Sequence, residues 1–160
     1  MNKILNIDKA VQVSKVVRDT GGKLVLAGGC FDILHVGHIQ FFERAKKFGD
    51  HLMLLIESDE TVKRLKGVNR PINSQKNRAR VLTALSTVDS VCLLPSISTN
   101  KAYESLVLRL KPAIIATTTG DLFQKQKEKQ AKSVDGKVIR IKNLKDHSTT
   151  RIAQLLSQNL

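Results

Sequence analysis

Residues 28–38 of the chain read Gly28-Gly29-Cys30-Phe31-Asp32-Ile33-Leu34-His35-Val36-Gly37-His38. The apolar run Leu24-Val25-Leu26-Ala27 comes directly before them and is typical of a buried strand. Residues 39–47 follow them, and their apolar side chains recur with the period of a helix. The segment is therefore predicted to form a glycine-containing turn that joins a buried strand to a helix.

Two histidines occupy the first turn of the expected helix. His35 and His38 are three residues apart, so both side chains lie on one face of the helix. The N-terminus of a helix presents unpaired backbone N–H groups and a partial positive charge, which together bind phosphate. Gly37 between the histidines leaves room for a ligand to approach the backbone. The pattern predicts a phosphate-binding site at the start of this helix.

A zinc site is the alternative interpretation of two histidines at this spacing. Zinc needs further His, Cys or carboxylate ligands, and none follows at a suitable distance along the sequence. His51 and His147 have no helical pairing, and the chain contains no C-x-x-C motif. We therefore expect no metal ion held by protein ligands alone.

Length and composition indicate one domain over residues 1–160, with a leading helix over 1–22 and the core over 23–160. A hydrophobic fraction of 41% excludes a disordered chain. The longest apolar stretches, such as Leu52 to Ile56, are too short to cross a bilayer. The N-terminal residues also lack the apolar core of a signal peptide. We therefore expect a cytoplasmic protein that is not inserted in a membrane.

The two cysteines agree with a reducing compartment. Cys30 and Cys92 provide no disulfide framework. Cys30 could be interpreted as a nucleophile, but it ends a predicted buried strand, where a small side chain is the simpler interpretation.

The net charge of +13 raises the question of a nucleic-acid partner. The basic residues are scattered along the chain, aromatic residues make up only 4%, and tryptophan is absent. Few side chains are therefore available to stack on bases. We expect part of the charge to serve anionic substrates, and we do not expect nucleic acid to be the main partner.

Helical and extended segments alternate along the chain. Strands are predicted at about 23–27, 51–57, 88–94, 113–116 and 137–141. Helices are predicted at about 8–19, 35–48, 59–65, 74–86, 99–110 and 148–158, with a charged helix or loop at 122–132. Short apolar strands that alternate with helices predict an α/β fold, a Rossmann-like parallel five-stranded sheet with helices on both faces. Ligands of such sheets bind beyond the carboxyl ends of the strands.

Three motifs in this order resemble a known family. Residues 29–38 resemble the H-x-G-H signature of the cytidylyltransferase-like nucleotidyltransferases. Leu65-Lys66-Gly67-x-x-Arg70-Pro71 is similar to the family's basic loop, and Ser148-Thr149-Thr150 is similar to its closing motif. The resemblance covers nearly the whole chain. Within the family, the Leu65–Pro71 string and the leading helix are most similar to the adenylyltransferases that form ADP-heptose for lipopolysaccharide.

The resemblance implies a reaction and a set of site residues. A sugar phosphate would attack the α-phosphate of ATP and release pyrophosphate, with Mg²⁺ bound to the triphosphate and with a homodimer as the assembly. The implied catalytic residues are His35, His38 and Lys66. The implied nucleotide-binding residues are Cys30, Phe31, Gly37, Arg78, Gly120, Asp121, Ser148 and Thr149. Asp32 is the implied contact to the second substrate, and a structural role in ordering the turn is an equal alternative. For Arg78, the alternative to nucleotide contact is an exposed position on the surface of a helix.

The sequence departs from the family pattern in two places. The turn at Thr117 to Asp121 is one residue longer and richer in β-branched residues, and Asp146 stands where the family usually has glycine. The nucleotide substrate can therefore be ATP or CTP, and the identity of the acceptor also stays open. The alternatives are glycerol 3-phosphate or ethanolamine phosphate with CTP, and FMN with ATP. The alternative that is not an enzyme is a domain that binds a nucleotide or RNA without catalytic activity. A class I aminoacyl-tRNA synthetase, which also carries H-x-G-H, is excluded because its second signature loop is absent.

Overall fold

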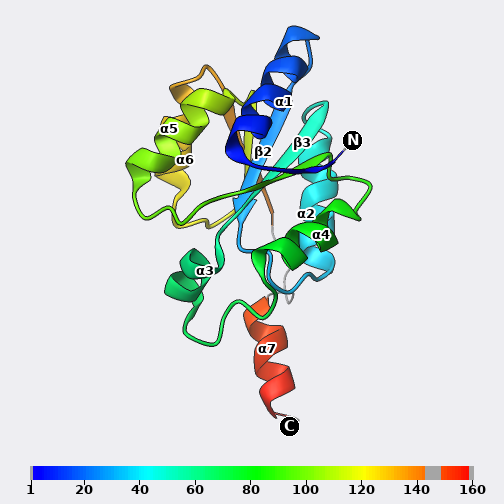
Figure 1. Ribbon diagram of the computed structural model, residues 1–160, viewed down its shortest axis with the longest axis vertical. Coiled ribbons are helices and arrows are strands. Elements are labelled where there is room, and N and C mark those ends of the chain that lie inside the picture. The colour runs from blue at the N-terminus through cyan, green and yellow to red at the C-terminus, as the bar shows by residue number, and fades with distance from the viewer. Residues whose placement is uncertain (1, 143–148, 159–160) are drawn as a thin grey trace.

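The structure of the chain is a computed structural model, and it describes residues 2–142 and 149–158. Its centre is a parallel sheet of six strands in the order β1-β4-β3-β2-β5-β6 (Figure 1). The strands are β1 (Ile4–Leu5), β2 (Leu24–Gly29), β3 (His51–Ile56), β4 (Ser90–Leu93), β5 (Ile114–Thr118) and β6 (Lys137–Ile141). The α/β class and the parallel sheet are confirmed.

The prediction of five strands was wrong by one. The additional strand, β1, pairs in parallel with β4, where Ile4 lies opposite Val91. Two residues are too few to show an alternating pattern, so no pattern in the sequence predicts this strand. The leading segment is consequently part of the sheet and consists of more than a helix.

Five of the described helices begin after residues whose side chains accept backbone N–H bonds. Ser58, Ser74 and Thr99 cap α3, α4 and α5 in this way. The first helix is capped by Asn6, whose side chain accepts a hydrogen bond from the backbone N–H of Lys9 at 2.9 Å. The helices are α1 (Ile7–Asp19), α2 (Val36–Lys46), α3 (Asp59–Lys66), α4 (Gln75–Thr83), α5 (Asn100–Leu110), α6 (Gln124–Lys132) and α7 (Thr149–Gln158).

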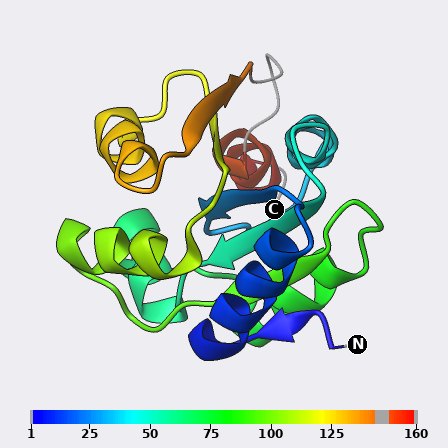
Figure 2. The same ribbon diagram turned by 90° about the horizontal axis from the view of Figure 1, so that it is seen from above.

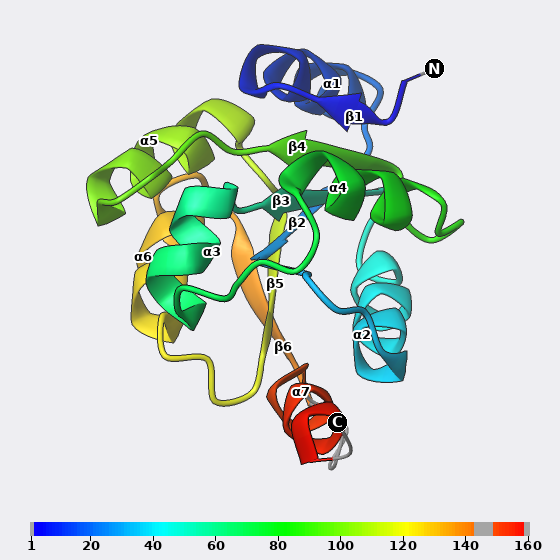
Figure 3. The ribbon, with the colours of Figure 1, turned by 60° about the horizontal axis from the view of Figure 1, so that its bottom comes forward.

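The sheet lies between two groups of helices. Helices α1, α5 and α6 pack on one face, over a core that includes Leu26, Met53 and Leu106. Helices α2 and α4 pack on the other face, over a core that includes Phe42 and Leu54. Figures 2 and 3 show the sheet between these layers. The strands read as apolar runs because both of their faces are covered.

The direction in which strands are added reverses at β2. Strands β3 and β4 lie on one side of β2, whereas β5 and β6 lie on the other. Such a reversal opens a crevice beyond the carboxyl ends of the two strands that flank it, here β2 and β5. Helices α3 and α7 lie at this end of the sheet (Figures 1 and 3). Among the helices that the structure describes, none has the length and apolarity that crossing a bilayer requires.

Candidate active site

His35 and His38 meet at the first turn of α2, beyond the carboxyl end of β2. Nδ1 of His35 accepts a hydrogen bond from the backbone N–H of Gly37 at 3.2 Å. Nδ1 of His38 accepts a hydrogen bond from the backbone N–H of His35 at 3.3 Å. The two ring centroids are 4.0 Å apart. The predicted pairing of these two side chains on one helix face is therefore present in the structure.

These hydrogen bonds determine which nitrogen of each ring can donate. A ring nitrogen that accepts an N–H bond carries no proton, so a neutral His38 ring carries its proton on Nε2. Burial lowers the pKa of His38 to about 4, and the neighbouring His35 acts in the same direction. His38 is consequently neutral at physiological pH, and it offers a single N–H donor without bringing a positive charge.

Phe31 shapes the loop before the histidines. Its ring is buried and makes edge contacts with His38 and Phe42, at centroid distances of 5.7 Å and 5.3 Å. Its backbone has a φ of 46°, a conformation that a bulky residue adopts only where the surrounding structure imposes it. Gly29 is required here because a Cβ atom would lie 2.9 Å from the Phe31 ring. The Phe31 ring thus belongs to the core, and only its backbone is placed to contact a nucleotide.

Helix α7 begins next to the same loop. The hydroxyl of Thr149, its first residue, donates a hydrogen bond to the carbonyl of Ile33 at 3.1 Å. The N-terminus of α7 therefore lies beside the loop that leads into α2, although the two are 116 residues apart in the chain. Two helix N-termini that converge in this way concentrate positive potential where a polyphosphate would bind. Ser148 and Asp146 lie outside the described residues.

Lys66 is the last residue of α3 and is exposed. Gly67 follows it with a φ of 105°, a conformation that side chains rarely adopt, and so the helix ends there. The charge of Lys66 acts on the thiol of Cys30. Burial raises the pKa of Cys30, and Lys66 is the strongest of the charges that oppose this rise. The structure thus places Lys66 within electrostatic range of the Cys30 thiol at the end of β2, and its catalytic role stays a prediction. A raised pKa also leaves Cys30 a protonated thiol and therefore a poor nucleophile.

Asp32 anchors the basic loop that contains Lys66 and Arg70. Its carboxylate accepts bonds from Arg70 Nε at 2.6 Å and from the backbone N–H groups of Ile72 at 2.7 Å and Asn73 at 2.9 Å. Burial acts to raise the pKa of Asp32, but these hydrogen bonds outweigh it and lower the pKa. Both carboxylate oxygens are thus engaged within the chain. The structure shows the alternative in which Asp32 orders the turn, and contact with the second substrate stays a prediction.

Arg78 is buried, with only 1% of its surface exposed, so a surface position was the wrong alternative. Its guanidinium donates to the carbonyls of Asn73 at 3.0 Å, Cys30 at 2.5 Å and Glu57 at 2.8 Å. It also forms an ion pair with Asp59 at 2.7 Å. Arg78 thus joins the loops that leave β2 and β3 to the start of α4. This placement does not support direct contact with a nucleotide.

The turn after β5 lies on the other side of the crevice. Gly120 has a φ of 85° and is exposed, so the backbone of this turn is accessible to a ligand. The Asp121 carboxylate accepts hydrogen bonds from Thr117, Lys127 and the backbone N–H of Phe123. Burial acts to raise the pKa of Asp121, yet the bonds from Lys127 and Thr117 lower it. The carboxylate is therefore bound internally, and contact of Gly120 and Asp121 with a nucleotide stays a prediction.

Glu57 is a buried carboxylate at the carboxyl edge of the sheet that the sequence interpretation did not single out. It follows β3 directly and is 9% exposed. Its Oε1 atom accepts a hydrogen bond from the Tyr103 hydroxyl at 2.7 Å. Burial raises the pKa of Glu57 despite this bond and the nearby cations. The available signal was a carboxylate at the end of the apolar run Leu52–Ile56, where the carboxyl edge of the sheet was already expected.

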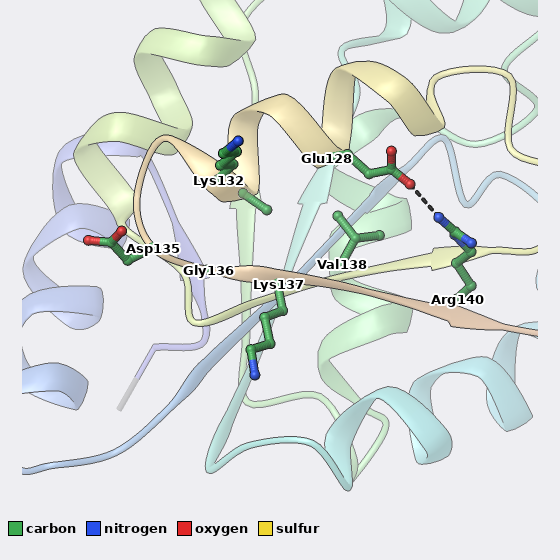
Figure 4. A pocket seen from close by; sticks show the side chains of 8 residues that line it. Glu128, Lys132, Asp135, Gly136, Lys137, Val138 and Arg140 are labelled. Atoms are coloured by element: carbon green, nitrogen blue, oxygen red, sulfur yellow. Dashed lines mark hydrogen bonds and ion pairs between the residues drawn. The ribbon is translucent and has the colours of Figure 1, made fainter.

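No group of three or more His, Cys, Asp or Glu side chains in residues 2–142 and 149–158 is arranged to hold a metal ion. A shallow hollow of about 480 Å³ lies along the outer edge of the sheet (Figure 4). Its lining comes from α6, β6 and the turn between them: Glu128, Ala131, Lys132, Asp135, Gly136, Lys137, Val138 and Arg140. None of the predicted site residues lines it.

Comparison with known proteins places this geometry in a family. The Cytidylyltransferase-like family matches residues 26–155. The chain is 49% identical over 89 residues to the Bifunctional protein HldE of Wolinella succinogenes, a match that covers 56% of this chain and 19% of that protein. The chain spans about a fifth of the length of the curated relatives that it matches.

Two solved structures share the fold. A lipopolysaccharide core biosynthesis protein from Thermoplasma volcanium superposes with a TM-score of 0.63 and 26% identity, covering 79% of this chain and all of the other. A pantoate-beta-alanine ligase from Francisella tularensis superposes with a TM-score of 0.64 and 17% identity, covering 98% of this chain and 77% of the other. The second likeness is one of fold alone. The match over residues 26–155 includes the paired histidines, Lys66 and Thr149, and the chain therefore belongs to the cytidylyltransferase-like family.

Proposed function

We propose that the chain transfers a nucleotidyl group from ATP to a sugar phosphate. A phosphate oxygen of the acceptor forms a bond to the α-phosphorus, the bond from that phosphorus to the bridging oxygen breaks, and pyrophosphate leaves with the electron pair. The attacking oxygen is already anionic, so the step needs no general base. Catalysis is then a matter of positioning and of stabilising negative charge.

The paired histidines are the observation that carries this proposal. Nδ1 of each ring accepts a backbone N–H bond, and the Nε2–H of the neutral His38 ring can donate to a phosphate oxygen as charge develops, with the His35 ring beside it. The N-termini of α2 and α7 add backbone donors and positive potential for the pyrophosphate. Lys66 adds a mobile positive charge near the end of β2. No covalent intermediate is required, which agrees with the protonated state of Cys30.

The substrate is proposed to enter as MgATP, with the ion held by phosphate oxygens and water. Mg²⁺ commonly binds in this way, with few or no protein carboxylates. The described residues form no metal cage, and this is compatible with an ion that arrives and leaves with the nucleotide. We also propose a cytoplasmic location, where ATP is available, and a homodimer, as the family resemblance implies.

Heptose 1-phosphate is the acceptor that the comparisons favour. The curated relatives are bifunctional HldE proteins, and one structural neighbour carries lipopolysaccharide core biosynthesis in its name. This agrees with the resemblance of Leu65–Pro71 to the branch that forms ADP-heptose. We therefore propose that the chain is a heptose 1-phosphate adenylyltransferase that supplies ADP-heptose for lipopolysaccharide.

A nucleic-acid-binding role has less support. Several cations are engaged within the chain: Lys3 donates to the carbonyl of Val88, and Arg18 donates to that of Leu110. Part of the positive charge thus stabilises the fold and is not free to neutralise a phosphate backbone.

Pyrophosphate release tests the proposal. ATP and CTP should each be combined with heptose 1-phosphate and with glycerol 3-phosphate in the presence of Mg²⁺. We expect release only from ATP with heptose 1-phosphate. Release with CTP would assign the chain to a cytidylyltransferase branch, and no release in any combination would contradict the proposed reaction.

A further inference from the structure

Glu57 holds a buried polar atom that lacks a partner. Its Oε1 atom is bound to Tyr103, but its Oε2 atom accepts no hydrogen bond from any of the described residues. Nearly all buried polar atoms in native proteins are satisfied, so an exception requires an explanation. At the ligand-binding edge of a parallel sheet, the simplest explanation is a donor that the chain itself does not supply.

The nearby cations do not fill this role. Arg64, Arg78 and Lys127 all act on the Glu57 carboxyl from a distance, and each of them donates elsewhere. Arg64 donates to the carbonyl of Ile97 at 2.8 Å, and Lys127 donates to Asp121. The donors of Arg78 are directed to three loop carbonyls and to Asp59. The unpaired oxygen therefore stays available although positive charges surround it.

Glu57 also lies next to the proposed site of transfer. The backbone N–H of Glu57 donates to the carbonyl of Gly29 at 3.2 Å, and Arg78 donates to the carbonyls of both Cys30 and Glu57, so Glu57 lies beside the loop that leads to the paired histidines. Tyr103 and Lys127 belong to α5 and α6, whereas the paired histidines belong to α2 on the opposite face. In-line transfer requires the acceptor and the leaving pyrophosphate on opposite sides of the α-phosphorus. Because we assign the paired histidines and the N-terminus of α7 to the phosphates of ATP, the side where Glu57 lies is left for the acceptor.

The chemistry of the group restricts what it can bind. A carboxylate accepts hydrogen bonds and repels phosphate, so its ligand is a hydroxyl or amino group and not the phosphate of the acceptor. We propose that Oε2 of Glu57 accepts a hydrogen bond from a sugar hydroxyl of the acceptor, with Tyr103 as the residue that positions the carboxylate. This inference rests on the proposed function and makes Glu57 a specificity-determining residue of that site.

Steady-state kinetics of Glu57→Gln test the inference. Glutamine keeps an acceptor for Tyr103 and can replace the unpaired oxygen with an NH₂ group. We expect the KM for heptose 1-phosphate to rise about 10- to 100-fold, as is typical for losing a hydrogen bond to a charged group, with the KM for ATP within about twofold of its original value. Glu60→Gln is the matched control, because Glu60 is exposed in the first turn of α3. An unchanged KM for heptose 1-phosphate, or an equal rise for ATP, would overturn the inference.

A second variant keeps the test decisive if Glu57→Gln fails to fold. Tyr103→Phe removes only the hydroxyl that orients Glu57, so it should raise the acceptor KM by a smaller factor without changing the KM for ATP. Equal kinetics of Tyr103→Phe and the unmodified chain would overturn the positioning role. The proposed function fails separately, because in that case the unmodified chain itself releases no pyrophosphate with any acceptor.

Discussion

Nδ1 of His38 accepts a hydrogen bond from the backbone N–H of His35 at 3.3 Å. The bond belongs to the cap of α2, and it also leaves the proton of the neutral His38 ring on Nε2. This one hydrogen bond thus satisfies the backbone N–H of His35 and sets the tautomer of the His38 ring. The start of the helix and the phosphate donor are a single structural unit.

Replacing His38 with alanine should remove a transition-state donor while leaving the fold intact. We expect kcat to fall about 10²- to 10³-fold, the usual cost of removing one such donor. The lost capping bond should lower the free energy of unfolding by only about 1 kcal/mol. Pyrophosphate release and urea unfolding measure the two effects. His51→Gln is the control, since His51 bonds Ser90 outside the site at 2.8 Å, and a similar loss of kcat there would contradict the specific role of His38.

The lowered pKa of His38 predicts how stability depends on pH. The unfolded chain protonates this residue near its ordinary pKa of about 6.5, whereas the folded chain resists protonation until about pH 4. The unfolded state therefore binds more protons between these values, so stability is full above about pH 6.5 and decreases as the pH falls toward 4. The loss is at most about 3 kcal/mol.

Urea unfolding across this pH range, with His38→Asn for comparison, measures that dependence. The variant should show a flatter profile than the unmodified chain. NMR titration of the His38 ring should show the neutral form down to about pH 5. A midpoint near the ordinary histidine pKa would contradict the burial of this ring.

Lys66→Ala should separate catalysis from stability. Lys66 is exposed, so the free energy of unfolding should change by less than about 0.5 kcal/mol. The rate of pyrophosphate release should fall about 10-fold or more, because a charge near the transferring phosphate is lost. Lys63→Ala, another exposed lysine in the last turn of the same helix, is the control. If the two variants have equal rates, Lys66 is an ordinary surface lysine.

Arg78→Met should destabilise the protein without removing a ligand contact. The substitution keeps much of the volume but leaves the carbonyls of Cys30, Glu57 and Asn73 without their donor. We expect a loss of about 3 kcal/mol or more in urea unfolding, since each unsatisfied buried acceptor costs about 1–3 kcal/mol. Arg80→Met, exposed on the same helix, should change stability by less than about 0.5 kcal/mol. A small loss for Arg78→Met combined with a raised KM for ATP would favour direct nucleotide contact instead.

The sequence by itself determined the parallel α/β fold, five of the six strands and the paired histidines. These features are local: the turn at residues 28–38 is contiguous, and periodicity over neighbouring residues distinguishes strand from helix. The short strand β1 was not predicted because its pairing with β4 joins residues far apart in the chain. Periodicity carries no information about such a contact.

Only the tertiary structure decided which groups Asp32 and Arg78 bond and that Glu57 is buried. Asp32 binds the backbone of Asn73 across 41 residues, and Arg78 binds the carbonyl of Cys30 across 48. The sequence left each of these side chains open between a ligand contact and a structural role, or gave no role at all. Burial and the supply of hydrogen-bond partners decide between such roles, and both are properties of groups that meet only when the chain has folded.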